Sequence, residues 1–251
     1  MSRIGDISVY LKRMDASLLD KCWWIDKIPD EITTVVDFGC AAGNLKNMID
    51  YLMPRRFRYI GIDNSAEMRR LCQEKNIEVY EDLDHLPNDI DPNRTILVLN
   101  SVIHEIWTYL PVLQVCALFD KIALREFKYI AIRDMNLGEP RYEDVDDIVK
   151  TFERSPYADR WRYVSKHTLA NIHVCIKEFL LKYWYTENWE RERDEQYLWD
   201  IPSVVVDFIE YHTVYENHFF IPYVREKVLK DFGIVNDEYT HIKVLLEHVG
   251  V

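Results

Sequence analysis

A short apolar run that ends in a glycine-rich turn is the feature that most restricts how this chain can fold. Residues 35–45, VVDFGCAAGNL, place Gly39 and Gly43 four positions apart directly behind β-branched residues. The chain has only seven glycines, so two in one turn indicate a need for bare backbone there. Glycine permits positive φ angles and close approach of a ligand to the main chain. The pattern predicts a strand, a ligand-binding turn and then a helix.

The following residues alternate between strand-like and helix-like patterns. Short apolar runs at 33–38, 59–63, 77–80, 95–99 and 129–133 are separated by helical spacing at 44–51, a helix start at Asn64 to Glu67, and helical spacing within 111–127. Asn64 would cap its helix, with Glu67 three positions further on. Such alternation is typical of parallel βαβ units, whose ligands lie at the carboxyl ends of the strands. We therefore predict an α/β, Rossmann-like, doubly wound sheet.

Two further regions complete the predicted single domain over residues 1–251. We expect a helix at about 7–28, which forms an N-terminal extension over residues 1–30. Residues 139–200 are rich in charged and aromatic side chains, and we expect them to form a helical insertion of two to four helices that covers the sheet as a lid. After it we expect a helix at 204–209, a strand at 212–220, a helix at 223–230 and a strand at 240–247.

Charge and cysteine content narrow the class of partner. The formal net charge of −12 has the wrong sign for a protein that binds through many phosphate contacts, although Arg55, Arg56 and Arg58 leave a local basic patch open. The five cysteines are scattered without a C-x-x-C pair, which indicates reduced thiols, and we expect no metal site. No apolar segment suggests a membrane span or a secretory signal, so we expect a cytoplasmic protein.

Asp63 sharpens the interpretation of the glycine turn. It ends the second predicted strand about 20 residues further on, where an acidic side chain can accept both hydroxyls of a ribose. The turn itself is neither G-x-G-x-x-G, since position 41 is alanine, nor a P-loop, since it lacks the Lys-Ser/Thr pair. Together these residues predict a nucleoside-containing ligand.

Four segments, in order over about residues 33–135, resemble the motifs of the class I S-adenosylmethionine-dependent methyltransferases: VVDFGCAAGNL, YIGIDNSAEM, EDLDHLP and LVLNSVIHEI. A weaker similarity links NSVIHEIW and LLKYWYTENWERE to uncharacterised bacterial and phage methyltransferase-like proteins. The resemblance implies a seven-stranded, mostly parallel sheet with an antiparallel last strand, and S-adenosylmethionine as cofactor.

The resemblance also assigns roles to residues at matching positions. The methionine part of the cofactor would be surrounded by Asp37, Gly39, Cys40, Ala41 and Gly43. Asp63 and the adjacent Asn64 would meet the ribose, Asp82 and the backbone of Leu83 the adenine, and Asn100 and Ser101 the sulfonium.

The acceptor side of the site is less determined. A sulfonium methyl is already activated, so the enzyme mainly aligns the reactants and, where needed, supplies a base. His104 is the first candidate base because its ordinary pKa lies nearest neutrality, although it could equally pack at a helix start. Tyr185 and Glu187, in an aromatic and charged segment, are second candidates, against the alternative of an amphipathic helix with an aromatic core face.

The sequence thus predicts a methyltransferase whose acceptor is unidentified, with a small aromatic molecule or a nucleoside as the first candidates. RNA or DNA methylation is one alternative. A module that binds S-adenosylmethionine or S-adenosylhomocysteine without catalysis is another, and transfer of a different part of the cofactor is a third.

Overall fold

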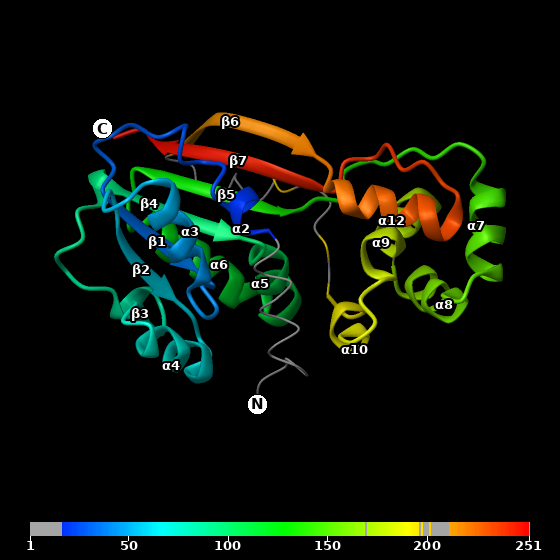
Figure 1. Cartoon of the computed structure of the whole chain (residues 1–251), viewed down its shortest axis with the longest axis horizontal. Coiled ribbons are helices and arrows are strands. Elements are labelled where there is room, and N and C mark those ends of the chain that lie inside the picture. Colours follow the sequence, from blue (N-terminus) through cyan, green and yellow to red (C-terminus); the bar gives the residue numbers. More distant parts are fainter. Residues whose placement is uncertain (1–16, 169, 196, 198–200, 202–210, 251) are drawn as a thin grey trace.

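The computed structural model describes residues 17–168, 170–195, 197, 201 and 211–250. Its centre is a seven-stranded sheet in the order β3-β2-β1-β4-β5-β7-β6 (Figure 1). The strands are β1 (Thr34–Phe38), β2 (Arg58–Ile62), β3 (Glu78–Tyr80), β4 (Thr95–Asn100), β5 (Tyr129–Met135), β6 (Tyr211–Phe219) and β7 (His241–His248). The first five pair in parallel, whereas β7 is antiparallel to both β5 and β6. The predicted fold class is confirmed.

The order of the strands fixes where a ligand can bind. The chain moves outward from β1 to β2 and β3, and then returns to the other side of β1 to form β4. The connections after β1 and β4 therefore diverge to opposite sides, which leaves a crevice at the carboxyl ends of these two strands.

Helices cover both faces of the sheet. They are α3 (Asn44–Leu52), α4 (Ala66–Glu74), α5 (Ile103–Tyr109) and α6 (Val112–Ala123), with 3-10 turns at Leu83–His85 and Pro92–Arg94. Neighbouring residues of β1 point to opposite faces, as strand geometry requires. Val36 belongs to the apolar cluster under Phe119 of α6, and Val35 to the cluster under Ile49 of α3. We call the sheet with these helices the sheet lobe.

A second group of helices lies beside the sheet lobe (Figure 1). Between β5 and β6 come α7 (Val145–Arg154), α8 (Ala158–His167), α9 (Ile172–Lys182) and α10 (Trp189–Glu192), and between β6 and β7 comes α12 (Pro222–Phe232). One apolar cluster joins Phe152, Trp161 and Phe179 with Val228 and Phe232 of α12. We call these five helices the helical lobe. The sequence did not indicate that α12 would pack with the helices of residues 139–200.

The structure corrects three local predictions. Ser65, not Asn64, caps α4, because its Oγ accepts a hydrogen bond from the backbone N–H of Met68 at 3.4 Å. The segment 103–109, which is absent from the helices predicted above, forms α5 and ends just before Pro111. Within the described part of the expected N-terminal helix, only α2 (Leu18–Lys21) is helical, and residues 22–27 form turns.

Other expectations fall outside the described residues. Positions 7–16 of the N-terminal helix and the helix expected at 204–209 belong to this group. Of the helices that the structure describes, none is long and apolar enough to cross a membrane.

Candidate functional site

A pocket opens at the carboxyl ends of β1 and β4, where the strand order predicts a ligand crevice. Three segments line it: the glycine-rich turn, the end of β4 and the short helix α2. The lining residues are Leu18, Lys21, Asp37, Gly39, Cys40, Ala41, Ala42, Asn44, Leu45 and Asn100. The structure thus brings Asp37, the glycine turn and Asn100 together, and it adds Leu18 and Lys21, which the sequence did not single out.

Glycine is required in the turn by local packing as well as by any ligand. Gly39 and Gly43 have φ angles of +76° and +70°. A Cβ atom on Gly39 would lie 2.9 Å from Cγ2 of Val102, and one on Gly43 would lie 2.6 Å from Cδ1 of Ile77. Either Cβ would force its neighbour to move, and a larger residue would be strained at these positive φ angles whatever the space, so the need for bare backbone inferred from the sequence has a structural cause of its own.

The backbone N–H groups of this turn are directed toward β2. Those of Gly39 and Cys40 both donate to the carbonyl oxygen of Ile62, at 2.8 and 2.9 Å. The N–H of Ala41 donates to Oδ2 of Asp63 at 2.9 Å. The turn is therefore fixed by its neighbour strand before any ligand arrives, which is the preorganisation that a binding loop needs.

Asp63 follows β2 at the same edge of the sheet as the pocket. Its Oδ1 accepts a hydrogen bond from the backbone N–H of Ser65 at 2.9 Å, so each carboxylate oxygen has one backbone donor. Burial raises the pKa of Asp63 above its ordinary value. A carboxylate oxygen can accept more than one hydrogen bond, so both oxygens keep capacity for the hydroxyls of a ribose.

The remaining residues predicted to bind a nucleoside lie at the ends of β2 and β3. Asn64 is exposed, and Leu83 is buried. Asp82 caps the 3-10 turn that follows it: its Oδ1 accepts from the backbone N–H groups of Asp84 and His85 and lies 2.7 Å from Nδ1 of His85. Their contacts with an adenosine stay predictions.

The pocket brings buried groups of opposite charge together. Asp37 is 4% exposed and accepts a hydrogen bond from the hydroxyl of Tyr59 at 2.5 Å, and burial raises its pKa to about 6. Lys21 is 3% exposed; burial lowers its pKa to about 8, although Asp37 and Asp134 oppose that shift. Oδ1 of Asn100 is buried and has no hydrogen-bond partner among the described residues. Such a pocket suits a ligand that carries both signs of charge together with hydrogen-bond donors.

A second cluster of charged groups surrounds His104 at the start of α5. Its Nδ1 lies 2.7 Å from Oδ1 of Asp134, at the carboxyl end of β5, and its Nε2 lies 3.6 Å from Oε2 of Glu195. Oδ2 of Asp134 accepts from the backbone N–H groups of Ile103 and His104, at 2.8 and 3.2 Å. Burial alone would lower the pKa of His104, but the two carboxylates outweigh it and raise this pKa well above the ordinary value.

Arg191 extends this cluster into the helical lobe. Its guanidinium donates to Oε1 of Glu195 at 2.8 Å and to Oε1 of Glu105. The hydroxyl of Tyr109 donates to Glu195 as well, at 3.3 Å. Burial favours the neutral form of Glu195, yet His104 and Arg191 bring its pKa down to about 2. The cluster therefore joins α5 of the sheet lobe to the segment after α10 through buried charges.

Side chains of the same cluster could ligate a metal ion. Ligand atoms of His104, Glu105 and Glu195 all lie within 4.8 Å of one another. However, Arg191 already bonds to both glutamates, and the raised pKa of His104 keeps a proton on its ring. A metal ion would have to displace both of these cations.

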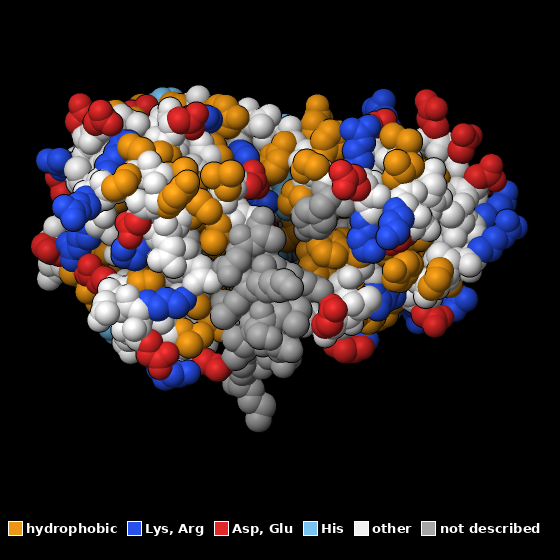
Figure 2. Space-filling model, in the orientation of Figure 1, with side chains coloured by type: hydrophobic (Ala, Val, Ile, Leu, Met, Phe, Trp, Pro, Cys, Tyr) orange, Lys and Arg blue, Asp and Glu red, His pale blue; other side chains and the backbone are white. Residues whose placement is uncertain are grey.

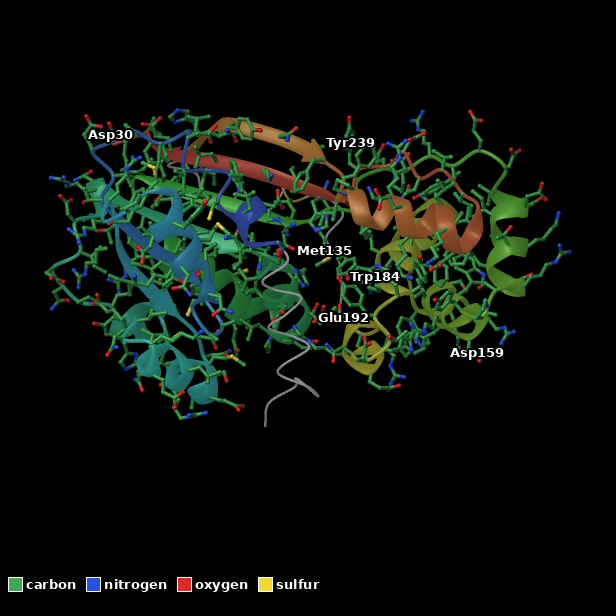
Figure 3. The ribbon with its side chains drawn as sticks, in the orientation of Figure 1. Asp30, Met135, Asp159, Trp184, Glu192 and Tyr239 are labelled. Atoms are coloured by element: carbon green, nitrogen blue, oxygen red, sulfur yellow. The ribbon has the colours of Figure 1, made fainter. Side chains whose placement is uncertain are left out.

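The other two predicted catalytic residues, Tyr185 and Glu187, belong to the segment between α9 and α10. The ring of Tyr185 stacks on that of Trp184 at a centroid distance of 4.1 Å, and Glu187 is exposed on the turn before α10. Figure 3 shows Trp184 and Glu192 on the side of the helical lobe that faces the sheet lobe. Ser101, which was predicted to border the sulfonium of the cofactor, directly follows β4. It has a φ angle of +56°, and its Oγ accepts a hydrogen bond from Arg133 at 2.8 Å. The structure thus places Tyr185 near the junction of the lobes and Glu187 at the surface.

Comparison with known proteins supports the fold. No family profile and no curated protein sequence matches the chain. Among solved structures, the plantazolicin methyltransferase BamL, in complex with a triazolic desmethylPZN analog and SAH, superposes with a TM-score of 0.52 at 8% identity over 97% of this chain and 90% of that one. A SAM-dependent methyltransferase from Aquifex aeolicus gives 0.50 at 16% identity over 98% and 100%, and MccD protein gives 0.50 at 12% over 91% and 95%. At these identities the similarity shows the fold alone.

Proposed function

We propose that this chain, which has the fold of the class I S-adenosylmethionine-dependent methyltransferases, binds S-adenosylmethionine at the ends of β1 and β4 and transfers its methyl group. The observation that carries the proposal is the pocket that joins the glycine-rich turn to Asn100, with Asp63 beside it at the end of β2. The neighbour BamL was crystallised with SAH, the demethylated product of this cofactor, which supports the same ligand here.

The residues of the pocket fit such a ligand. Oδ1 of Asn100 is a buried acceptor that needs a donor, and the α-ammonium group of the cofactor would supply one. Asp37, which is buried beside it, would add negative charge near the same ammonium group. Asp63 would accept the ribose hydroxyls, while Asp82 and the backbone of Leu83 would lie at the adenine.

The cofactor supplies an activated methyl group on a sulfonium, so the protein mainly has to hold the reactants in line. Asn100 and Ser101, after β4, would border the reacting end. The buried turn after β1 would keep water from the methionine end. A base is needed only for an acceptor whose proton is held tightly at neutral pH.

His104 stays the first candidate for that base, and Tyr185 and Glu187 stay the second candidates. His104 lies between two carboxylates that hold it protonated at neutral pH, whereas a base must begin the reaction without its proton. Its contacts to Asp134 and Glu195 also support a second role, in which it fixes the helical lobe against the sheet lobe. The rate at different pH values separates the two roles.

For the acceptor we favour a small aromatic molecule or a nucleoside, bound where the helical lobe faces the carboxyl edge of the sheet. The stacked pair of Trp184 and Tyr185 on that side offers a flat surface for a planar ring. The neighbour BamL was crystallised with a triazolic desmethylPZN analog.

Methylation of RNA or DNA is less well supported. In the predicted basic patch, Arg56 pairs with Asp30 at 3.3 Å, and Arg58 pairs with Glu78 and Asp89 at 2.8 and 3.1 Å. On the face shown in Figure 2, basic and acidic side chains are interspersed over both lobes. A surface on which acidic side chains are interspersed with basic ones repels phosphates as well as attracting them, so it binds a nucleic-acid backbone weakly.

Two experiments test the proposal in sequence. Calorimetry with S-adenosylhomocysteine should show binding to the wild-type protein, and folded protein that gives no heat at several temperatures would contradict the cofactor assignment. Incubation with methyl-labelled S-adenosylmethionine and fractionated small molecules, RNA and protein should then transfer label to the small-molecule fraction. Tight binding without any transfer would instead favour a non-catalytic module. Transfer of label from S-adenosylmethionine labelled in its carboxyl carbon, but not from the methyl-labelled cofactor, would indicate that another part of the cofactor is transferred.

A further inference from the structure

We infer that Lys21 binds the α-carboxylate of the cofactor, so that α2 forms one wall of the cofactor site. This inference rests on the proposed function, because it assigns one end of the same ligand. The sequence resemblance covers residues from about 33 onward and gives no role to Lys21.

The backbone around Lys21 is fixed over the pocket by its neighbours. Asp20 pairs with Nε of Arg133 at 2.7 Å and with Nζ of Lys243 at 2.5 Å, which ties α2 to β5 and β7. The carbonyl oxygen of Lys21 accepts from Nδ2 of Asn100 at 3.4 Å, so the helix also contacts the end of β4. These contacts place Lys21 beside Asp37 and Gly39 in the pocket lining.

A lysine in such a place is unusual, because an ammonium group loses its hydration when it is buried. Lys21 is 3% exposed, whereas Lys27, six residues further on, bonds to exposed Asp26 at 2.9 Å. Burial lowers the pKa of Lys21 only to about 8, so most of the protein carries the charge at neutral pH. A cation kept in a ligand pocket favours an anionic group on the ligand.

The carboxylates that act on Lys21 also accept from other donors. Asp37 accepts from the hydroxyl of Tyr59, Asp134 accepts from backbone N–H groups of α5 and contacts His104, and Asp20 bonds to Arg133 and Lys243. A ligand carboxylate in the pocket would add a further acceptor for Lys21, and the bond would be a charge-assisted one.

The amino-acid end of the cofactor carries one ammonium and one carboxylate. Oδ1 of Asn100 and the carboxylate of Asp37 suit the ammonium, and Lys21 suits the carboxylate. The pocket would therefore recognise a zwitterion at two points. A compound that keeps the adenosine and the thioether but lacks the carboxylate should lose only the contact to Lys21.

The test compares two ligands on three proteins by calorimetry at pH 7. The ligands are S-adenosylhomocysteine and its decarboxylated form, which differs only in lacking the carboxylate. The proteins are the wild type, Lys21→Met and, as a matched control outside the pocket, Lys27→Met. We expect Lys21→Met to weaken binding of S-adenosylhomocysteine at least tenfold and binding of the decarboxylated form less than twofold. Lys27→Met should leave both affinities within twofold of the wild type.

Each other outcome contradicts a distinct claim. Equal weakening of both ligands by Lys21→Met would mean that Lys21 only stabilises the pocket, and unchanged affinities would remove it from the site. If Lys21→Met fails to fold, the affinities of the wild type for the two ligands still test the inference. Tighter binding of S-adenosylhomocysteine than of its decarboxylated form would support a cation at the carboxylate, and equal affinities would show that no cation contacts it. A wild type that binds neither ligand would overturn the proposed function itself.

Discussion

Oδ2 of Asp63 accepts a hydrogen bond from the backbone N–H of Ala41 at 2.9 Å, which ties the glycine-rich turn after β1 to the end of β2. The two segments that would meet the amino-acid end and the ribose of the cofactor are thus joined by one carboxylate. A change at Asp63 should affect both.

Asp63→Ala should weaken binding of S-adenosylhomocysteine at least tenfold. The variant loses an acceptor for the ribose hydroxyls and also the bond that fixes Ala41. Calorimetry measures the affinity, and circular dichroism checks the fold. Asp89→Ala is the control, because Asp89 is an exposed partner of Arg58. If Asp63→Ala binds as tightly as Asp89→Ala, Asp63 does not contact the ribose.

His104→Ala should lose most turnover, by about a hundredfold or more, while it binds S-adenosylhomocysteine within threefold of the wild type. Because Asp134 and Glu195 raise the pKa of His104, a base role requires the wild-type rate to increase with pH above the ordinary histidine range near 6.5. The pH dependence of kcat checks this, with His167→Ala as an exposed-histidine control. Undiminished turnover in His104→Ala would assign His104 to the junction of the lobes alone.

Asp37→Asn should stabilise the protein at pH 7 and weaken cofactor binding. The pKa of Asp37 is about 6 in the folded protein against 3.8 in the unfolded chain, so folding takes up a proton between these values and stability falls as pH rises through them. Ionised Asp37 therefore costs up to about 3 kcal/mol at pH 7, and asparagine removes that cost while it still accepts from Tyr59. Thermal unfolding at pH 7 and pH 3.5 checks this. A stabilisation equally large at both pH values would contradict the stated cause.

Glu195→Gln should lower the free energy of unfolding by about 1–3 kcal/mol, because it removes the counter-charge of buried His104 and Arg191. Denaturant titration measures it. Asp159→Asn, in an exposed pair with Arg162, should cost less than about 0.5 kcal/mol.

The effect of Glu195→Gln on the free energy of unfolding should also depend on pH. The folded-state pKa of His104 is raised, so its stabilising effect is complete below about pH 6.5 and is lost as pH rises through the folded value. Glu195→Gln should flatten that loss. Equal costs for Glu195→Gln and Asp159→Asn at every pH would mean that the lobes are joined by other contacts.

The strands of the sheet could be predicted from local patterns, because each buried strand is a short apolar run in the sequence. Thr34 to Phe38 and Thr95 to Leu99 are short β-branched runs between turn signals, and both became strands. The cap of α4 was predicted one residue too early, at Asn64 instead of Ser65. Both residue types are good N-caps, so the sequence pattern does not decide at which of the two the helix begins. The helix α5 was missed because its seven residues are too few to establish a helical period.

The residues that sequence reasoning missed depend on contacts between distant segments. Lys21 lies on a helix where a lysine is expected to face solvent, and only the position of α2 over β1 and β4 buries it. Glu195 approaches His104 from the helical lobe, and no local pattern indicates that meeting. Arg133 and Asp134 are neighbours near the end of β5, but no local spacing predicts that they contact Asp20 and His104.

The helix α12 has a consequence for any attempt to transplant substrate specificity between proteins of this fold. It lies in the chain between the two antiparallel strands, yet its Phe232 packs on Phe152 and Phe179 of the helical lobe. Exchanging residues 139–195 alone would leave apolar side chains of α12 facing water, so a chimera that retains solubility has to carry residues 222–232 with them.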